Sequence, residues 1–379
     1  MTATIIGAAS AAIWFYLIAL RGGFWRIRVE PVRSSAPPRA VTAVIPARDE
    51  AAVIGRAVAS LLTQRYRGPL DVVLVDDHSA DGTAKIARAA ASAVDAPGRL
   101  TIIRAEPLPA GWSGKLWAVR HGIAAASPRE PDYLLLTDGD IVHAPDNVAE
   151  LVARAERGGY DLVSLMVKLH CRGFSERLLI PAFVFFFFKL YPPRHVADPA
   201  RRVAAAAGGC MLIRREALER IGGVDSIRGE IIDDCALARR VKAAGKVWLG
   251  VSGDTVSIRE YGSWRPIWDM IARCAFAQLG YSTPALVGTV AGMALVYLAP
   301  PVLLLLGPTP ARVFGAAAWA GMSAAFVPVL RLYRCPVALA PLLPAAAVFY
   351  TAATVWSAIQ YWRGRGGRWK GRYQASPAR

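Results

Sequence analysis

Short apolar runs that lead into acidic residues constrain the fold of this chain most. Each run is five or six residues long, is rich in Val, Ile and Leu, and is followed by a longer amphipathic stretch. The runs with acidic residues after them are Val41–Pro46, Leu70–Val75 and Tyr133–Thr137. Strands that alternate with helices indicate an α/β fold with a mostly parallel sheet. Continuous apolar strands suit a sheet that is covered on both faces.

The acidic residues after these strands are expected to gather along one edge of the sheet, where ligands bind in open parallel sheets. Asp138 and Asp140 flank Gly139, which lets the backbone turn so that both carboxylates face one site. Mg²⁺ typically binds through one or two carboxylates together with substrate phosphates. The pattern therefore predicts an enzyme that acts on an activated, phosphorylated donor, although an isolated Asp-Gly-Asp is also ordinary turn chemistry.

The other strand ends supply further candidates for donor binding. Asp76 and Asp77 could accept hydrogen bonds from a nucleotide, or they could belong to a helix-capping loop. Asp49 and Glu50 end the first strand, and Glu50 could equally be a favourable charge in the first turn of the next helix. Lys115, in Gly111-Trp112-Ser113-Gly114-Lys115, could reach donor phosphates, although this segment is not a P-loop.

An adjacent acidic pair stands apart from these strand ends. Asp233 and Asp234 precede a helical stretch that closes at Gly245. Carboxylates at a helix start are ordinarily caps. A pair beside a donor site could instead supply a general base.

Membrane-length apolar runs occupy both ends of the chain. The hydrophobic fraction is 54% and the mean hydropathy is positive, which is unusual for a soluble protein. Residues 1–22 are expected to form an uncleaved transmembrane anchor, because the arginines near this run follow it rather than precede it. About three more spans are expected within residues 284–362. Segments 174–192 and 264–282 are expected to lie in the membrane interface. The first could alternatively be a transmembrane helix and the second a core helix of the α/β domain.

The formal charge of +17 is concentrated toward the C-terminus, because no Asp or Glu follows Asp269. Basic residues beside apolar spans favour membrane lipids and the cytoplasmic side. The charge of the predicted basic tail, 363–379, favours the cytoplasmic side of the membrane. Alternation of the predicted spans, starting from a cytoplasmic α/β domain, places the tail on the opposite side, and both placements stay open. No nucleic-acid-binding signature accompanies the charge, so nucleic acid is not an expected partner. Five widely spaced cysteines argue against a disulfide scaffold and a zinc site.

The ordered motifs resemble those of the inverting family 2 glycosyltransferases. The segment from Ile45 to Glu50 resembles the first strand and loop of that family, Val75–Thr83 its nucleotide motif, and Asp138-Gly139-Asp140 its D-x-D metal motif. Gly208–Ile213 is similar to the acceptor-side strand of the family. The resemblance implies a nucleotide-diphospho-sugar transferase (GT-A type) domain, which we expect at residues 41–255.

The resemblance also implies residue roles. Pro46, Asp49, Glu50, Asp77, Lys115 and Asp138 would bind the nucleotide sugar, Asp138 and Asp140 would hold a divalent cation (Mg or Mn), and Asp234 would be the base with Asp233 beside it. Within the family, the chain looks like the ceramide-glucosyltransferase-like branch and most like the hopanoid-associated bacterial enzymes. Two departures stand out: Asp233-Asp234 replaces the usual Glu-Asp pair, and the Q-x-x-R-W motif of processive synthases is not intact.

These inferences lead to one expected function. The chain is expected to transfer a sugar, with inversion, from a nucleotide-sugar donor to a lipid hydroxyl of hopanoid or sphingolipid type. It would be a multi-pass protein of the bacterial inner membrane with its α/β domain in the cytoplasm. A polyprenyl-phosphate acceptor and a non-catalytic membrane scaffold remain as alternatives. The first would need no general base, and the second would not need every acidic motif.

Overall fold

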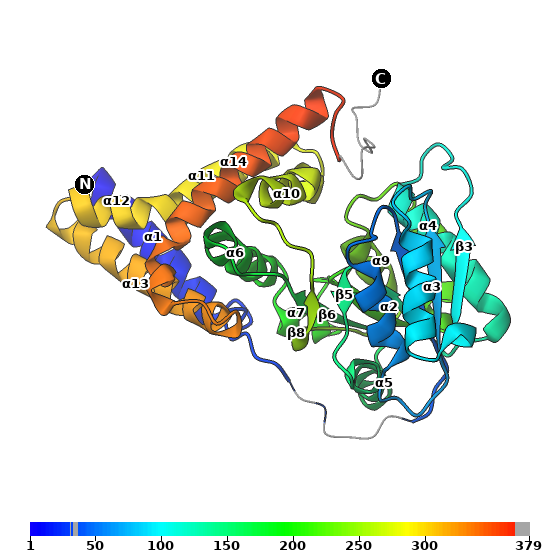
Figure 1. The fold of residues 1–379 in the computed structure, drawn as a ribbon. Helices are drawn as coiled ribbons and strands as arrows, with labels where there is room; N and C mark the ends of the chain where they lie inside the picture. Colours follow the sequence, from blue (N-terminus) through cyan, green and yellow to red (C-terminus); the bar gives the residue numbers. More distant parts are fainter. Residues whose placement is uncertain (31, 33–36, 368–379) are drawn as a thin grey trace. The chain divides into compact units, whose positions relative to one another are not determined.

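The computed structural model describes residues 1–30, 32 and 37–367, which form two compact units (Figure 1). The first, here called the helical unit, contains Met1–Arg28, Cys171–Arg194 and the chain from Glu260 onward. The second, the sheet unit, contains Val29–His170 and His195–Arg259. Residues 368–379, most of the predicted basic tail, lie outside the described residues.

The sheet unit is built on an eight-stranded sheet with the order β3-β2-β1-β4-β7-β6-β8-β5. Strand β7 is antiparallel to both of its neighbours and the short β5 is antiparallel to β8, whereas the other adjacent pairs are parallel. The strands are β1 (Val41–Ala47), β2 (Leu70–Asp76), β3 (Leu100–Arg104), β4 (Tyr133–Thr137), β5 (Ile141–Val142), β6 (Leu162–Lys168), β7 (Cys210–Arg214) and β8 (Val247–Ser257). The predicted α/β fold with a mostly parallel sheet is confirmed.

Helices cover the two faces of this sheet because its strands are apolar on both sides. Ala43 and Ile45 of β1 belong to a buried cluster that also contains side chains of α2, α3 and α5. The opposite face packs against α4 so closely that a Cβ on Gly122 would lie 2.3 Å from Val44 Cγ1. The helices of the unit are α2 (Ile54–Leu62), α3 (Thr83–Ala93), α4 (Gly114–Ala126), α5 (Asn147–Gly158), α8 (Arg215–Arg220) and α9 (Asp233–Lys242), and the short α7 (Pro193–Ala197) straddles the two units.

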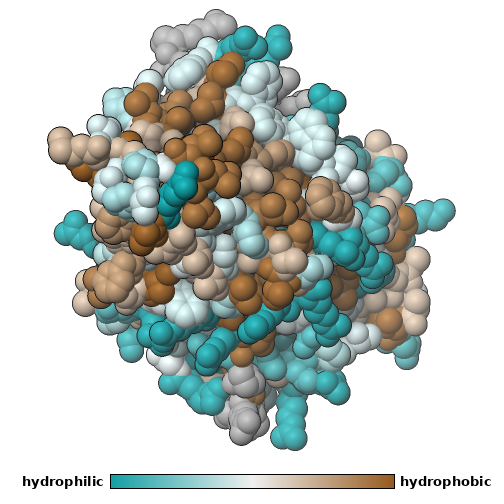
Figure 2. Space-filling view, turned by 90° about the vertical axis from the view of Figure 1, so that its left-hand side faces the viewer, coloured by the Kyte–Doolittle hydropathy of each residue, from teal (hydrophilic) through white to brown (hydrophobic). Residues whose placement is uncertain are grey.

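Among the described residues, the helical unit contains four helices that are long and apolar enough to cross a membrane: Thr2–Ala19, Thr283–Leu306, Thr309–Leu332 and Val337–Trp362. The first span is α1 (Thr2–Ala19), and the third is α13 (Thr309–Leu332). The second span consists of α11 (Thr283–Met293) and α12 (Ala299–Leu306), which are joined by a π-helical turn at Ala294–Leu298. The fourth span begins with a 3-10 turn at Val337–Leu342 and continues as α14 (Leu343–Trp362). On the face shown in Figure 2, hydrophobic residues form broad areas. These helices indicate a membrane-associated protein.

Two further helices belong to this unit, α6 (Phe174–Leu190) and α10 (Trp264–Gln278). Helix α6 packs against α10, α13 and α14. Phe185 of α6 makes an edge-to-face contact with Phe326 of α13, with ring centroids 5.4 Å apart. Glu176 ties the start of α6 to the loop before α10, since its carboxylate accepts hydrogen bonds from the backbone N–H groups of Gly173 and Tyr261 at 2.9 Å each. The predicted interfacial position of α6 and α10 stays a prediction.

Candidate active site

The loops that follow β1 and β2 are joined by hydrogen bonds between side chains and backbone. Asp49 Oδ1 accepts from the backbone N–H of Ala80, and Ser79 Oγ accepts from the backbone N–H of Asp49, each at 3.0 Å. Asp77 is buried, and its Oδ2 lies 3.5 Å from Arg48 Nη1. The parallel pairing of β1 with β2 thus brings Asp49 and Asp77 to neighbouring strand ends.

The turn after β4 places Asp140 in an interior position with a cation beside it. Asp140 is 8% exposed, and its Oδ2 accepts a hydrogen bond from Ser257 Oγ at 2.5 Å. Arg259 Nε lies 3.4 Å from the same oxygen, and Arg259 Nη2 donates to both carboxylate oxygens of Glu50 at 2.7 and 2.6 Å. Burial raises the pKa of Asp140, and the positive charge of Arg259 opposes that rise. Arg259 therefore neutralises two carboxylates that come from different strand ends.

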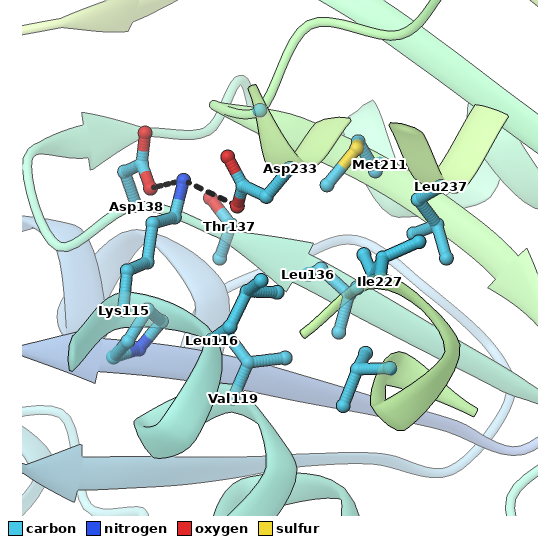
Figure 3. Close-up of a pocket in the computed structure, with 13 residues that line it drawn as sticks. Lys115, Leu116, Val119, Leu136, Thr137, Asp138, Met211, Ile227, Asp233 and Leu237 are labelled. Carbon is cyan, nitrogen blue, oxygen red and sulfur yellow. Dashed lines mark ion pairs between the residues drawn. The ribbon is translucent and has the colours of Figure 1, made fainter. Parts of the chain in front are cut away.

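A second cation, Lys115, joins the Asp-Gly-Asp turn to the start of α9 (Figure 3). Lys115 Nζ lies 2.9 Å from Asp138 Oδ1 and 3.4 Å from Asp233 Oδ2. Burial opposes the charge on Lys115, but Asp138 and Asp233 together raise its pKa above the ordinary value. Ser113 caps α4 by accepting from the backbone N–H of Leu116, which fixes the first turn that carries Lys115.

The pocket around this ion-pair cluster has charged groups at one side and an apolar floor. Its residues come from β1, α4, β4, β7 and the segment that leads into α9. Its lining is Pro46, Lys115, Leu116, Val119, Leu136, Thr137, Asp138, Gly208, Met211, Val224, Ile227, Asp233 and Leu237. Pro46 thus lines the same pocket as Lys115, Asp138 and Asp233.

Asp234 is held by backbone groups rather than by a cation. Its Oδ2 accepts from the N–H of Gly208 at 2.9 Å, and its Oδ1 accepts from the N–H of Cys235 at 2.7 Å. Burial and the neighbouring charge of Asp233 raise the pKa of Asp234 to about 6, and Lys115 opposes that rise. Of the acidic pair, Asp233 is therefore neutralised by an ion pair, whereas Asp234 is hydrogen-bonded by backbone N–H groups.

A buried polar network lies behind the Asp-Gly-Asp turn. Thr137 Oγ1 donates to the carbonyl of Gly209 at 2.8 Å and lies 3.0 Å from His143 Nε2, which must then be the donor to Thr137. Asn147 Nδ2 lies 2.9 Å from His143 Nδ1. Burial lowers the pKa of His143 to about 3, so the ring is neutral. The network links the end of β4 to the Gly208-Gly209 segment that carries the contact with Asp234.

The carboxylate oxygens around Asp140 suit a hard divalent cation only if a bound diphosphate or water supplies the remaining coordinating oxygens. Among the described residues, no group of three or more His, Cys, Asp or Glu could hold a metal alone. The contacts of Asp140 with Ser257 and Arg259 both involve Oδ2, which leaves Oδ1 as a possible ligand oxygen. Mg²⁺ and Mn²⁺ accept carboxylate oxygen, and Mg²⁺ commonly takes its remaining ligands from phosphates and water. Asp138 and Asp140 therefore fit such an ion together with a diphosphate.

The structure brings most of the predicted site residues to one edge of the sheet. Glu50, Asp138 and Asp140 surround Arg259, while Asp138, Asp233 and Asp234 surround Lys115. Sequence reasoning missed Ser257, which ends β8, Arg259, which lies two residues beyond it, and His143. The apolar run Val247–Val251, followed by Ser257 and Arg259, is the signal that could have identified a further strand with a charged residue after it.

Comparisons with known proteins agree with this fold. A mannosyltransferase from Pyrobaculum calidifontis, in complex with GDP-Man and Mn²⁺, is similar over 94% of this chain and 98% of its own, with 22% identity and a TM-score of 0.55. Glucosyl-3-phosphoglycerate synthase from Mycobacterium tuberculosis matches 64% of this chain and 79% of its own, with 20% identity and a TM-score of 0.39. No curated protein sequence matches the chain.

Two family descriptions match the sequence itself. "Glycosyl transferase family 2" matches residues 42–222, which hold the strand-end motifs from Asp49 to Asp140. "Glycosyl transferase family group 2" matches residues 133–359, which is more than half of the 379-residue chain. The family predicted from the motifs is thereby confirmed, and the chain belongs to the family 2 group of glycosyltransferases.

Proposed function

We propose that this protein transfers a sugar from a nucleotide-sugar donor to a lipid hydroxyl, with inversion at the anomeric carbon. The observation that carries the proposal is the Lys115–Asp138–Asp233 ion-pair cluster beside the Asp140–Arg259–Glu50 cluster. A site of this kind offers carboxylates for a metal ion and for nucleotide hydroxyls, and cations for a diphosphate. The four membrane-length helices in the same chain support an acceptor that resides in a membrane.

The nucleoside part of the donor would lie across the loops after β1 and β2. Asp77 and Asp49 would accept hydrogen bonds from the base or the ribose, with Pro46 shaping the floor of the pocket. Asp138 would hold the ribose side of the donor, and Lys115 would turn from Asp138 toward a diphosphate oxygen. A divalent ion bound by Asp140 and Asp138 would supply charge neutralisation for the leaving diphosphate. Glu50 and Arg259 would keep the Asp140 carboxylate in position.

The chemical step would need a base, for which we propose Asp234. Its carboxylate would take the proton of the acceptor hydroxyl while the hydroxyl oxygen bonds to the anomeric carbon. The bond from that carbon to the diphosphate oxygen would break, and the nucleoside diphosphate would leave with the bonding electrons. One displacement of this kind inverts the configuration. Asp233, paired with Lys115, would orient the acceptor side.

The acceptor and the membrane orientation follow from the motif resemblance. We propose a glycolipid-forming enzyme of the ceramide-glucosyltransferase-like branch, acting on a hopanoid-like or sphingolipid-like hydroxyl. It would sit in the bacterial inner membrane with the sheet unit in the cytoplasm, where nucleotide sugars are made. A polyprenyl-phosphate acceptor is the second candidate, and the raised pKa of Asp234 favours the hydroxyl over it because an anionic phosphate oxygen needs no base.

The experiment that tests the function is a transfer assay in membranes. Membranes containing the protein are incubated with a panel of nucleotide sugars, including GDP-mannose, with Mg²⁺ or Mn²⁺, and the lipids are analysed by mass spectrometry. We expect a glycolipid with the wild type and with Asp95→Asn, a control in an exposed turn, and none with Asp140→Asn. Equal product from Asp140→Asn, or full activity in EDTA, would contradict the metal assignment. Transfer of the sugar to the phosphate group of a lipid would contradict the hydroxyl acceptor and favour the polyprenyl-phosphate acceptor.

A further inference from the structure

A positive charge with no acidic partner lies within the helical unit, at the end of α6. Lys189 Nζ donates to Tyr297 Oη at 2.8 Å, and it lies 4.8 Å from the centroid of the Tyr297 ring and 5.4 Å from that of Phe186. Within the described part of the chain, no carboxylate lies within ion-pair distance of Lys189, and the neighbouring charge is another cation, Arg21. Charged groups in a membrane domain are expensive unless they are paired, so an uncompensated one indicates a functional site.

The dipole of α6 does not explain this charge. A lysine in the last turn of a helix can be stabilised by the helix carbonyls. Here Arg21 already occupies them, since its Nε and Nη2 lie 3.4 and 3.3 Å from the carbonyl oxygens of Lys189 and Leu190. Burial, with the charge of Arg21 added, lowers the pKa of Lys189 to about 8, so the ammonium still carries its proton at neutral pH for most of the time.

The aromatic surroundings of Lys189 are held by well-defined contacts. Tyr297 lies in the π-helical turn Ala294–Leu298, and π-turns of this kind often occur at functional positions. Trp14 of α1 donates from Nε1 to the carbonyl of Val296 at 2.8 Å, and its ring packs edge-to-face on Tyr297. The Tyr297 side chain is therefore fixed from two sides, with Phe186 packed edge-to-face against it.

The groups that remain available in this cluster are hydrogen-bond donors. An ammonium has three N–H donors, and Tyr297 Oη accepts one of those of Lys189. Tyr297 is fully buried, so its Oη positions the ammonium and does not itself face a ligand. Among the described residues, no acceptor for the other two ammonium N–H groups is found in hydrogen-bonding range. A cluster of donors with net positive charge is complementary to an anion with several oxygens.

The position of the cluster suits a lipid. Helix α1 ends at Ala19, and Arg21 lies two residues later and contacts the carbonyl of Lys189, so Arg21 and Lys189 lie at one end of a membrane-length helix. Lipid phosphates are found at that level of a bilayer. Lys189 is partly exposed, which leaves it within reach of a ligand. We propose that Lys189 and Arg21 form a binding site for the phosphate group of an anionic membrane lipid, with the buried Tyr297 hydroxyl holding Lys189 in place, and that this site is independent of the proposed transfer reaction.

The test measures lipid binding by native mass spectrometry of the full-length protein. The probes are phosphatidylglycerol, diacylglycerol with the same chains and no phosphate, and inorganic phosphate. We expect retained phosphatidylglycerol with the wild type and no comparable binding of the other two probes. Lys189→Met should weaken phosphatidylglycerol binding by about tenfold or more, the effect of losing a charge-assisted hydrogen bond. Lys189→Arg should keep most of the binding, and Tyr297→Phe should weaken it to a smaller extent.

The matched control is Arg177→Met, which removes an exposed cation from the same helix α6. It should bind phosphatidylglycerol like the wild type. The proposal is overturned if Lys189→Met and Tyr297→Phe both retain wild-type binding, or if Arg177→Met loses as much binding as Lys189→Met. Binding of inorganic phosphate that depends on Lys189 and equals that of the lipid would assign the site to free phosphate instead. None of these outcomes depends on sugar transfer, so they are separate from the test of the proposed function.

Discussion

Arg259 holds together two carboxylates that belong to separate motifs. Its guanidinium reaches Glu50 with Nη2 and Asp140 with Nε, so the planar fork serves both partners at once. A lysine has a single charged nitrogen and cannot reproduce that geometry. Because Arg259 contacts both carboxylates, it limits the repulsion between Asp140 and Glu50.

We expect Arg259→Lys to reduce turnover by about tenfold, corresponding to about 1.4 kcal/mol of lost stabilisation in the transition state. The measurement is the initial rate of glycolipid formation at saturating donor. The control is Arg215→Lys, which alters an exposed pair with Glu219 within α8 and should leave the rate unchanged, because exposed pairs contribute little. Equal rates for the wild type and Arg259→Lys would show that the fork is not needed.

The raised pKa of Asp234 predicts a pH dependence of catalysis. A base must be deprotonated to accept a proton, and the folded protein holds the proton on Asp234 until the pH rises past about 6. Turnover should therefore fall as the pH drops below about 6 and reach a plateau above it. Since the charge of Asp233 raises this pKa, Asp233→Asn should shift the acidic limb to lower pH. The measurement is turnover between pH 4.5 and 8.5 with matched ionic strength.

Asp234→Asn tests the same assignment without changing the pH. It should lower turnover by about 10²-fold or more, the typical contribution of a general base. Donor affinity should change little, because the proposed nucleotide contacts come from other residues. If Asp233→Asn is the inactive variant and Asp234→Asn works normally, the two roles are reversed. Normal turnover by both variants would indicate a phosphate acceptor.

A glycine pair, Gly208-Gly209, directly precedes strand β7 and allows the backbone to approach α4 and α9 closely. A Cβ added to Gly208 would lie 3.2 Å from Asp234 Oδ2 and 3.2 Å from Lys115 Nζ. The Gly208 N–H also donates to Asp234, so the backbone here positions the proposed base directly. Position 208 is a glycine because the backbone before β7 approaches the side chains of Asp234 and Lys115 closely.

We expect Gly208→Ala to lower turnover by about tenfold with little change in melting temperature, because Asp234 and Lys115 must shift to make room for the methyl group. Small displacements of catalytic groups are costly to rate. Turnover and thermal unfolding in detergent are the two measurements. Gly98→Ala is the control, since a Cβ at that position would meet no atom within 4 Å. Wild-type turnover in Gly208→Ala would remove Gly208 from the site.

The molecule as a whole carries more than one membrane-length helix. Helix α1 packs against α13 and α12, and Trp14 of α1 donates to Val296. Deleting residues 2–20 should leave the protein in the membrane fraction after carbonate extraction, because three membrane-length helices remain. The deletion should also lower the melting temperature in detergent, since α13 loses its partner. A carbonate-soluble product would show that α1 is the essential anchor.

Local pattern in the sequence was enough to predict strands β1 to β4, the acidic residues that follow three of them, and the membrane-length helices, whereas β6 and β8 were not predicted. Apolar runs such as Leu70–Val75 form buried strands because both faces of the strand are apolar and must be kept from water. The parallel order of these strands brings Asp77 and Asp138 to one edge of the sheet. Hydropathy over about 20 residues identifies a span because a bilayer has a fixed thickness. These properties are set by neighbours in the chain, so they can be read without coordinates.

The cation partners were decided only by the tertiary structure. Arg259 contacts Glu50 across 209 residues of sequence, and Lys189 contacts Tyr297 across 108. The antiparallel insertion of β7 between β4 and β6 places Gly208 against Asp234, which no periodicity of that segment specifies. An ion pair or a hydrogen bond forms only where two backbones approach within a few ångströms. That approach depends on how distant elements pack, and a local pattern carries no information about it.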